Sequence, residues 1–321
     1  MRTYWLMTAT LGLLLAAGGV HAQQKYPTKP IRMIVPFPSG GQTDIVARML
    51  AQKLTDAFKQ TVVVDNRPGG GGTIGAEIAV RANPDGYSLI MVSTSYAANA
   101  ALYKLPYDPL NDVVPIALIG EIANLVVVHP AGPAKSVKEL IAYDKANPGK
   151  LNYGSGGTGS GTHLATELFN QMAGTKLTHV PYKGAGAGLS DLLGGQIQLI
   201  FGGLPVMIPH VKSNRLRGIA VTSAKRSNAV PDIPTVAETV PGYEAVSWAA
   251  VLGPKALPKD IVARWNREIE RILQLSDVKE RMAADGLEPV GGSPERFREV
   301  LHRDVAKWQK VVKIAGIKPG S

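Results

Sequence analysis

Hydrophobic residues follow two alternating patterns along the first third of the chain. Runs of consecutive apolar residues, which are typical of buried strands, occur at 31–35, 61–64 and 87–92. Apolar residues at helical spacing predict one helix that opens at Gln42 and a second helix over 74–81. Alternating strands and helices of this length predict a parallel sheet, and such sheets bind ligands beyond the carboxyl ends of their strands.

The same alternation returns in the rest of the chain. Strands are predicted at 125–128, 177–180, 198–201, 216–221 and 247–252, and helices at 137–146, 164–172, 189–193, 259–273, 276–285 and from 293 onward. The chain thus crosses twice between two similar halves, near 122–126 and near 245–249, which predicts a two-lobed clamp with a hinge. We expect domain 1 at residues 23–124 plus 247–321, and domain 2 at residues 125–246.

Two glycine-rich turns each lie between a predicted strand and the start of a helix. One runs from Tyr153 to His163, and the other from Pro36 to Asp44. Backbone N–H groups at a helix start have no partner within the helix, and the helix dipole adds partial positive charge there. Each turn is therefore an anion-binding device. In the first of these turns, further donors come from the hydroxyls of Ser155, Thr158, Ser160 and Thr162. Residues 39–44 and 93–95 should share one edge of the sheet.

Several side chains near these turns allow two interpretations. Asp44 could simply cap its helix, or it could orient the loop or contact a polar group of the ligand. His163 and Glu167 are four residues apart and could form an acid–base or metal-binding pair. The simpler interpretation has His163 donating to the loop backbone and Glu167 facing water, because no third and fourth ligand has telling spacing. Lys183, after Tyr182, could pair with a ligand carboxylate or be solvated.

The chain lacks the sequence signatures of an enzyme. Glycines at 154, 156 and 159 match the dinucleotide-binding fingerprint, but the next predicted strand does not end in the acidic residue that this motif requires. No G-x-S-x-G or P-loop motif is present. We therefore expect reversible binding of an anion, with no catalysis, no cofactor and no metal.

The first 22 residues have the features of a secretory signal peptide. They carry one positive charge at Arg2, an apolar run from about residue 11 to 20, and a small-x-small sequence that predicts cleavage after about Ala22. The apolar run is shorter than the ~20 residues that span a bilayer. The chain has no cysteine, which excludes both disulfides and the lipoprotein route of anchoring.

The composition is that of a globular protein with a basic surface. The formal net charge is +10, which becomes +9 when Arg2 leaves with the signal peptide. Lysine and arginine are scattered without an aromatic-basic stripe, so together with export the charge argues against nucleic acid as a partner. A scattered basic surface can instead attract small anions.

Many ordered motifs cover nearly the whole mature chain. They include Val35-Pro-Phe-Pro-x-Gly-Gly-x-x-Asp44, Val64-x-Asn-Arg-Pro-Gly-x-Gly-Gly, Leu105-Pro-Tyr-Asp-Pro109, Tyr153-Gly-Ser-Gly and His179-Val-Pro-Tyr-Lys-Gly184. In these motifs the chain resembles the extracytoplasmic solute receptors of the tripartite tricarboxylate transporter family, often called Bug receptors. The resemblance implies an α/β, two-lobed type II periplasmic-binding-protein fold with a ligand cleft between the lobes.

The resemblance also implies a site, partners and a location. The loops 37–44 and 155–163 would grip a small carboxylate from opposite lobes, with ordered water completing the shell. The partners would be the large and small membrane subunits of a tripartite transporter, or alternatively a sensor kinase, with the receptor a monomer in the periplasm. The candidate ligand-binding residues are Phe37, Ser39, Gly40, Gly41, Asp44, Ser93, Thr94, Ser155, Thr158, Gly159, Ser160, Thr162, His163, Tyr182 and Gly202.

Two positions depart from the family pattern. Ser39 stands where relatives often have a second proline, and it adds a donor. Gly202 stands where many relatives have aspartate, which weakens the case for an amino-acid ligand with an ammonium group and is expected to make room in the pocket. These departures favour a di- or monocarboxylate with a bulkier or less polar body, aromatic bodies included.

Overall fold

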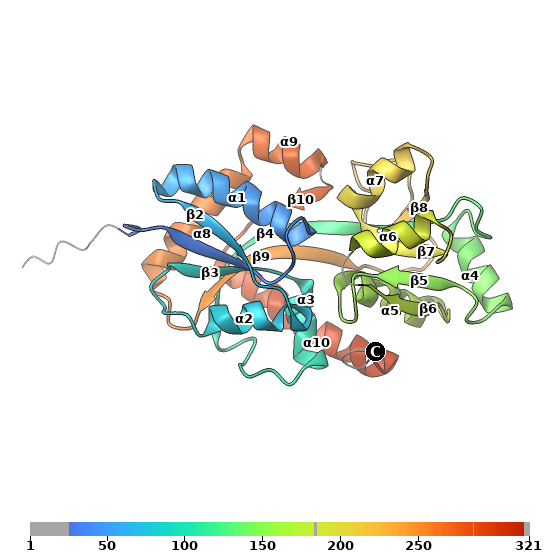
Figure 1. Cartoon of the computed structure of the whole chain (residues 1–321), viewed down its shortest axis with the longest axis horizontal. Coiled ribbons are helices and arrows are strands. Elements are labelled where there is room, and N and C mark those ends of the chain that lie inside the picture. The colour runs from blue at the N-terminus through green and yellow to red at the C-terminus, as the bar shows by residue number, and fades with distance from the viewer. Residues whose placement is uncertain (1–25, 183–184, 285, 318–321) are drawn as a thin grey trace, which may run out of the picture.

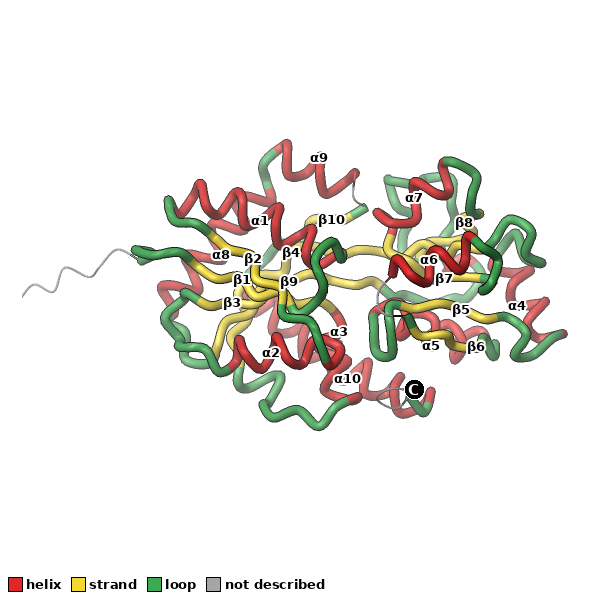
Figure 2. Tube along the Cα trace, in the orientation of Figure 1, coloured by secondary structure: helices red, strands yellow, loops and turns green. Residues whose placement is uncertain are grey.

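The chain forms two α/β lobes. The computed structural model describes residues 26–182, 185–284 and 286–317, so the predicted signal peptide and Lys183 lie outside the described residues. Figures 1 and 2 show the lobes side by side, connected through the long strands β4 (Val113–Val128) and β9 (Val246–Pro254). Within the described ranges, no helix is long and apolar enough to cross a membrane.

The first lobe is built on a mixed sheet with the strand order β2, β1, β3, β9, β4. Strand β1 (Ile31–Val35) pairs in parallel with β2 (Val62–Asn66) and β3 (Ser88–Ser93), whereas β9 runs antiparallel to β3 and to β4. A short strand, β10 (Leu287–Pro289), also pairs with β4. The predicted parallel pairing is therefore confirmed for β1–β3, whereas β9 enters the same sheet in the antiparallel direction. Strand β4 leads into the second lobe and β9 returns from it, so these two strands must run in opposite directions.

Helices cover both faces of this sheet. One face carries α1 (Gln42–Phe58), α8 (Lys259–Leu273) and α9 (Ser276–Ala284). The opposite face carries α2 (Thr73–Val80), α3 (Thr94–Leu102) and α10 (Pro294–Ala315), and a single 3₁₀ turn, Gly70–Gly72, precedes α2. Each face buries a separate apolar cluster, with Trp265 in one and Trp248 and Trp308 in the other.

The second lobe repeats this layered arrangement on a smaller scale. From β4 outward its strands are β7 (Leu199–Gly203), β5 (Asn152–Ser155) and β6 (Thr178–Pro181), and β8 (Arg217–Val221) also pairs with β4. Helices α4 (Val137–Ala146) and α5 (Gly161–Ala173) cover one face, and α6 (Ala185–Leu193) and α7 (Leu204–Lys212) cover the other. A 3₁₀ turn at Val236–Glu238 lies in the connection to β9.

Strand β4 belongs to both lobes. It pairs with β9 as far as Ala123, and from Asn124 onward it pairs with β7 and β8. Strand β9 begins its own pairing with β4 at Val246. On this basis we propose that the domain boundaries lie where the sequence places them, with domain 1 at 23–124 plus 247–321 and domain 2 at 125–246.

Two helices of the structure have no clear sequence signal, and one strand begins earlier than predicted. Helix α3 is buried nearly all round and rich in alanine, so it lacks the polar face that produces a helical period. Helix α7 contains Pro205 in its first turn and Pro209 near its end. Because proline is disfavoured inside helices, the composition of this segment does not predict a helix. Strand β4 starts at Val113, earlier than predicted, and its pairing with β9 shifts register near Pro115 and Gly120.

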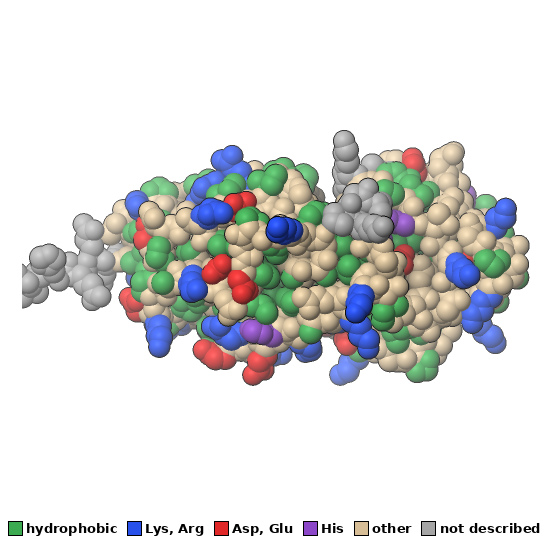
Figure 3. All heavy atoms as spheres, turned by 90° about the horizontal axis from the view of Figure 1, so that it is seen from below, with side chains coloured by type: hydrophobic (Ala, Val, Ile, Leu, Met, Phe, Trp, Pro, Cys, Tyr) green, Lys and Arg blue, Asp and Glu red, His purple; other side chains and the backbone are tan. Residues whose placement is uncertain are grey.

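The basic residues are dispersed over the surface. In the face shown in Figure 3, lysine and arginine side chains alternate with acidic and hydrophobic ones and form no continuous stripe. This distribution agrees with the scattered charge of the sequence.

Candidate functional site

A cavity of about 810 Å³ lies between the two lobes. Its wall is formed by the turns after β1, β2 and β5, by the starts of α1 and α5, and by the stretches of β4 and β9 where the chain crosses. These segments come from distant parts of the sequence and meet at the carboxyl ends of the parallel strands, where a sheet of this type places its ligand site.

Over the described residues, the cavity wall is uncharged and mostly apolar, with hydroxyl and amide groups set into it. No Asp, Glu, Lys, Arg or His is among the described lining residues, while hydroxyl and amide groups such as Ser160, Thr162 and Asn124 are. Phe37 and Trp248 add apolar surface. Backbone N–H groups and hydroxyls can bind a carboxylate through short, charge-assisted hydrogen bonds. An ammonium group, in contrast, would find no acidic partner on the described wall and would be costly to desolvate.

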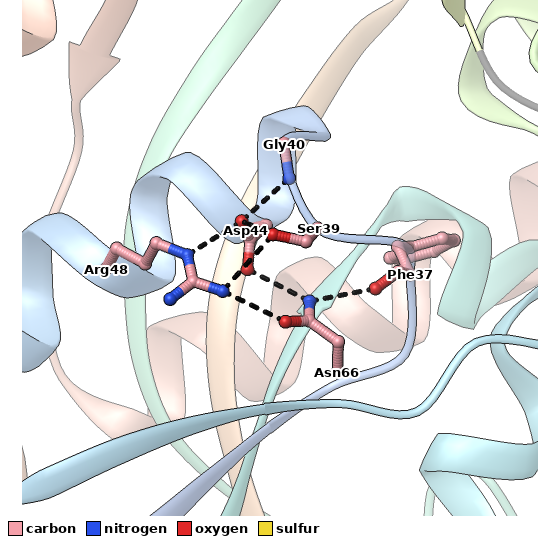
Figure 4. Close-up of polar contacts among 6 residues, drawn as sticks. All are labelled: Phe37, Ser39, Gly40, Asp44, Arg48 and Asn66. Carbon is pink, nitrogen blue, oxygen red and sulfur yellow. Dashed lines mark hydrogen bonds and ion pairs between the residues drawn. The ribbon is translucent and has the colours of Figure 1, made fainter.

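The turn after β1 is held in place by Asp44. Figure 4 shows the buried carboxylate of Asp44 accepting hydrogen bonds from Gly40 N (2.8 Å), Arg48 Nε (2.9 Å) and Asn66 Nδ2 (2.9 Å). Asn66 also donates to the carbonyl of Phe37, so β2 and the turn are tied together. Asp44 is outside the described lining of the cavity. The structure thus gives it the loop-orienting role, and direct contact with a ligand stays a prediction.

The charge state of Asp44 follows from these contacts. Burial by itself would raise the pKa of this carboxyl. The hydrogen bonds from Arg48, Gly40 and Asn66 outweigh burial and lower the pKa below its usual value. Asp44 is therefore ionised at neutral pH and satisfied by donors of its own loop.

The turn after β5 is organised by its own hydroxyls. Ser160 caps α5, accepting a hydrogen bond from His163 N (3.3 Å), and Thr162 Oγ1 accepts one from Gly156 N (3.0 Å). The hydroxyl groups of Ser160 and Thr162 are also 3.0 Å apart and hydrogen-bonded. Both residues line the cavity, so the helix start faces the space between the lobes.

Two stacked histidines lie behind this turn and hydrogen-bond to it. The rings of His163 and His179 lie 3.8 Å apart and are nearly parallel. His163 Nδ1 accepts a hydrogen bond from Gly159 N (3.0 Å), and His179 Nε2 lies 2.7 Å from Ser155 Oγ. Burial lowers the pKa of His163 to about 3, with a further contribution from His179, and burial lowers the pKa of His179 to about 4. Both imidazoles are therefore neutral at pH 7, and neither faces the cavity.

The proposed acid–base pair of His163 and Glu167 does not form. Glu167 accepts a hydrogen bond from Tyr153 Oη (2.6 Å) and another from Asn170. His163 accepts from the loop backbone, whereas the simpler interpretation of the sequence had it donating. Among the residues that the structure describes, no group of three His, Asp or Glu side chains could hold a metal ion.

The structure divides the predicted site residues into two sets. Those that line the cavity are Phe37, Gly41, Ser93, Thr158, Ser160, Thr162 and Tyr182. Those outside its described lining are Ser39, Gly40, Asp44, Thr94, Ser155, Gly159, His163 and Gly202. Several of the second set support the first, since Thr94 Oγ1, for example, accepts a hydrogen bond from Trp248 N (3.0 Å) and fixes β9.

Gly202 does not enlarge the pocket, and that expectation was wrong. The residue sits within β7, paired with Leu125, and a Cβ added to it would lie 2.2 Å from Cε of Met207. The buried side chain of Met207 therefore fills the space above Gly202. The preference for a less polar ligand body now rests on the cavity wall itself, which includes Phe37 and Trp248.

Sequence reasoning missed a third turn and several wall residues. The turn after β2 contributes Pro68, Gly69, Gly71 and Gly72 to the cavity. Its run of glycines after a predicted strand is the same signal that identified the other two turns. Gln42, Asn124 and Trp248 also line the cavity, but the latter two lie on the crossing strands, whose packing the sequence pattern does not reveal.

Comparisons with known proteins match one receptor family. A family model described as the tripartite tricarboxylate transporter family receptor matches residues 46–317. Protein BugT of Bordetella pertussis is 38% identical over 319 residues, which cover 97% of this chain and 98% of BugT.

Solved structures agree with that match. Rpa4515 of R. palustris, solved with adipate, is 38% identical with a TM-score of 0.86, over 92% of this chain and 99% of Rpa4515. The periplasmic binding protein BugD is 34% identical with a TM-score of 0.82, over 91% and 99%. MatC (Rpa3494) from Rhodopseudomonas palustris, solved with bound malate, is 29% identical with a TM-score of 0.82, over 89% and 100%. These likenesses confirm the predicted two-lobed α/β fold.

Proposed function

The chain belongs to the tripartite tricarboxylate transporter family of receptors, and from this premise we propose that it captures a small organic carboxylate between its lobes and delivers it to a tripartite tricarboxylate-type membrane transporter. It is a solute-binding receptor and not an enzyme. The location in the periplasm, after loss of residues 1–22, is part of the proposal.

The observation that carries the proposal is the uncharged, donor-rich cavity wall. The starts of α1 and α5 face this cavity from different lobes and bring backbone N–H groups to it. Two structural neighbours, Rpa4515 and MatC, were solved with adipate and malate respectively, both of them carboxylates. A ligand without an ammonium group fits the absence of acidic side chains from the described wall.

The ligand class can be tested by thermal shift. We would heat the mature chain, residues 23–321, with adipate, malate, hexanoate, benzoate, aspartate, glutamate or inorganic phosphate. A ligand at 100 times its Kd stabilises the folded state by about 2.7 kcal/mol, which raises Tm by several degrees. We expect aliphatic or aromatic carboxylates to raise Tm, and aspartate, glutamate and phosphate to leave it unchanged. If no carboxylate raised Tm, or only the amino acids did, the proposal would be wrong.

Delivery to a transporter needs a separate test. Cells that lack this receptor but keep its membrane subunits should lose uptake of the ligand found by thermal shift, and the chain supplied in trans should restore uptake. Unchanged uptake without the receptor would contradict the transport role. We do not propose the sensor-kinase alternative, because no feature of the described residues favours it.

A further inference from the structure

Two amide side chains at the seam between the lobes lack hydrogen-bond partners. The Nδ2 atom of Asn124 and the Nε2 atom of Gln42 are both shielded from solvent, and neither has a partner among the described residues. Asn124 itself is only 2% exposed. A buried N–H group without a partner costs about 1–3 kcal/mol, so such groups in a native fold call for an explanation.

The two amides come from different elements, α1 and β4, and both lie next to the same residue of the second lobe. Gln42 is the first residue of α1, while Asn124 is the first β4 residue that pairs with the second lobe. Asn124 is paired across the sheet with Gly203, and Gln42 Nε2 lies 3.3 Å from the position of a Cβ on Gly203. Both side chains therefore lie at the seam, next to Gly203.

Both residues also line the ligand cavity. Rotation about the terminal torsion of either side chain can turn its NH₂ group toward this space. An amide offers hydrogen-bond donors without a net charge, so it can bind a carboxylate, carbonyl or hydroxyl oxygen. The backbone of Asn124 is already engaged, because its N–H donates to Thr222 Oγ1 (2.8 Å) and its carbonyl accepts from Thr222 N (2.9 Å). Only its side chain is available to a ligand.

We infer that Gln42 and Asn124 form a second hydrogen-bonding subsite, which recognises an oxygen of the ligand other than the carboxylate bound at the helix starts. This inference rests on the proposed function and makes the ligand class narrower: a carboxylate with a second oxygen acceptor, such as a dicarboxylate.

The test compares two ligands that differ only in the second acceptor. Adipate and hexanoate have the same chain length, but only adipate has a second carboxylate. Isothermal titration calorimetry on the wild-type chain should show adipate binding at least about tenfold more tightly, the equivalent of one good hydrogen bond. In Gln42→Met and Asn124→Leu, adipate affinity should fall about tenfold toward that of hexanoate, whose affinity should stay the same.

A matched control removes an unpaired group elsewhere. The hydroxyl of Tyr107 is also buried without a partner among the described residues, and Tyr107 is outside the described cavity lining. Tyr107→Phe should leave both affinities unchanged. The Tm of ligand-free Gln42→Met and Asn124→Leu should be equal to or above that of the wild type, because each change removes a donor that has no partner in the fold. A purely structural role would lower Tm.

The outcomes separate this inference from the proposed function. If the variants lost affinity for adipate and for hexanoate equally, the amides would bind the carboxylate that both ligands share. That result would overturn the second subsite. Unchanged adipate preference in both variants would overturn it as well. If the wild type bound neither ligand while other carboxylates also failed, the proposed function itself would be wrong.

Discussion

At the scale of single residues, the site depends on groups that never touch the cavity. Asp44 and the pair His163–His179 lie behind the two ligand loops and fix them through hydrogen bonds to Gly40 and Gly159. Their residue types could be noted from the sequence, but their roles could not. Whether a carboxylate faces a ligand or its own loop depends on a few ångströms of loop geometry, and hydrophobic periodicity carries no information about that.

Removal of the Asp44 carboxylate should disorder the first loop. In Asp44→Ala, the donors on Gly40 and Asn66 lose their acceptor, which we expect to lower the free energy of unfolding by about 2–3 kcal/mol and to weaken ligand binding. Arg48→Met is the matched control, because the Arg48 side chain is half exposed and Gly40 and Asn66 still donate to Asp44 in this variant, so we expect a smaller effect. Urea denaturation and calorimetry measure both effects. Equal effects of the two substitutions would contradict the loop-orienting role.

The neutral histidine pair predicts a stability that depends on pH. Both folded-state pKa values, about 3 and about 4, lie below the usual 6.5, so unfolding takes up protons between these limits. The free energy of unfolding should therefore fall as the pH drops from about 6.5 to 4, by up to about 1.4 kcal/mol per pH unit for each histidine. Above pH 7, the two histidines should contribute no pH dependence to the free energy of unfolding. Urea denaturation of the wild type and of the double variant His163→Gln, His179→Gln measures this slope. Identical slopes would rule out the histidines as its source.

At the scale of elements, the strand–turn–helix units were predictable and their neighbours were not. The apolar run at 31–35 and the helical spacing after Gln42 locate β1 and α1 correctly, because β1 is buried over nearly its whole length and α1 has one buried and one polar side. Helix α3 has no such contrast, since α10 and the sheet bury it. The run of glycines after β2 was visible in the sequence, yet its place in the cavity depends on the parallel pairing of β1 with β2.

The loop before α5 also forms a contact between the lobes. Gly159 has φ +78°, and an added Cβ would lie 2.3 Å from Cδ1 of Leu102 on α3. Gly159→Ala should therefore lower the free energy of unfolding by about 1 kcal/mol, because alanine disfavours this backbone angle. The added methyl group should also obstruct closure of the lobes and weaken ligand binding about tenfold. Gly159 is outside the described cavity lining, so we expect the added methyl group to act on closure and not on the ligand directly.

Gly174 provides the control for this experiment. It has φ +65° at the other end of α5, where the nearest atom to an added Cβ is 3.9 Å away. Gly174→Ala should lower stability by a similar amount and leave calorimetric affinity unchanged. Addition of Leu102→Ala to Gly159→Ala should recover much of the lost affinity. Failure of that rescue, with folded protein, would show that the contact with Leu102 does not matter for binding.

At the scale of the whole molecule, we expect the lobes to move relative to one another when a ligand binds. Both crossing strands pass beside the cavity, and the fold class was predictable because the chain repeats one α/β pattern twice. The antiparallel direction of β9 could not be predicted from this pattern, because the direction of a strand depends on the lobe from which the chain enters it. Motion at this seam can be tested with a reversible crosslink.

The pair Gly161 and Ser247 suits such a crosslink. A Cβ on Gly161 would lie 3.9 Å from Cβ of Ser247, which is within the usual separation of about 3.5–4.5 Å for a disulfide. The natural chain has no cysteine, so Gly161→Cys with Ser247→Cys introduces a single pair. We expect oxidation to slow both ligand association and release in stopped-flow fluorescence, and reduction to restore wild-type rates. Equal rates in the oxidised and reduced forms would contradict closure at this seam.

The central claim is that an uncharged cavity binds a carboxylate through neutral donors. The most direct measurement is calorimetric titration of the mature chain with adipate and with adipamide, which has the same length but carries amides in place of both carboxylates. The account predicts that adipate binds and releases heat, whereas adipamide, which brings no negative charge to the helix starts, shows no measurable binding. Binding of adipamide as tight as that of adipate would contradict it.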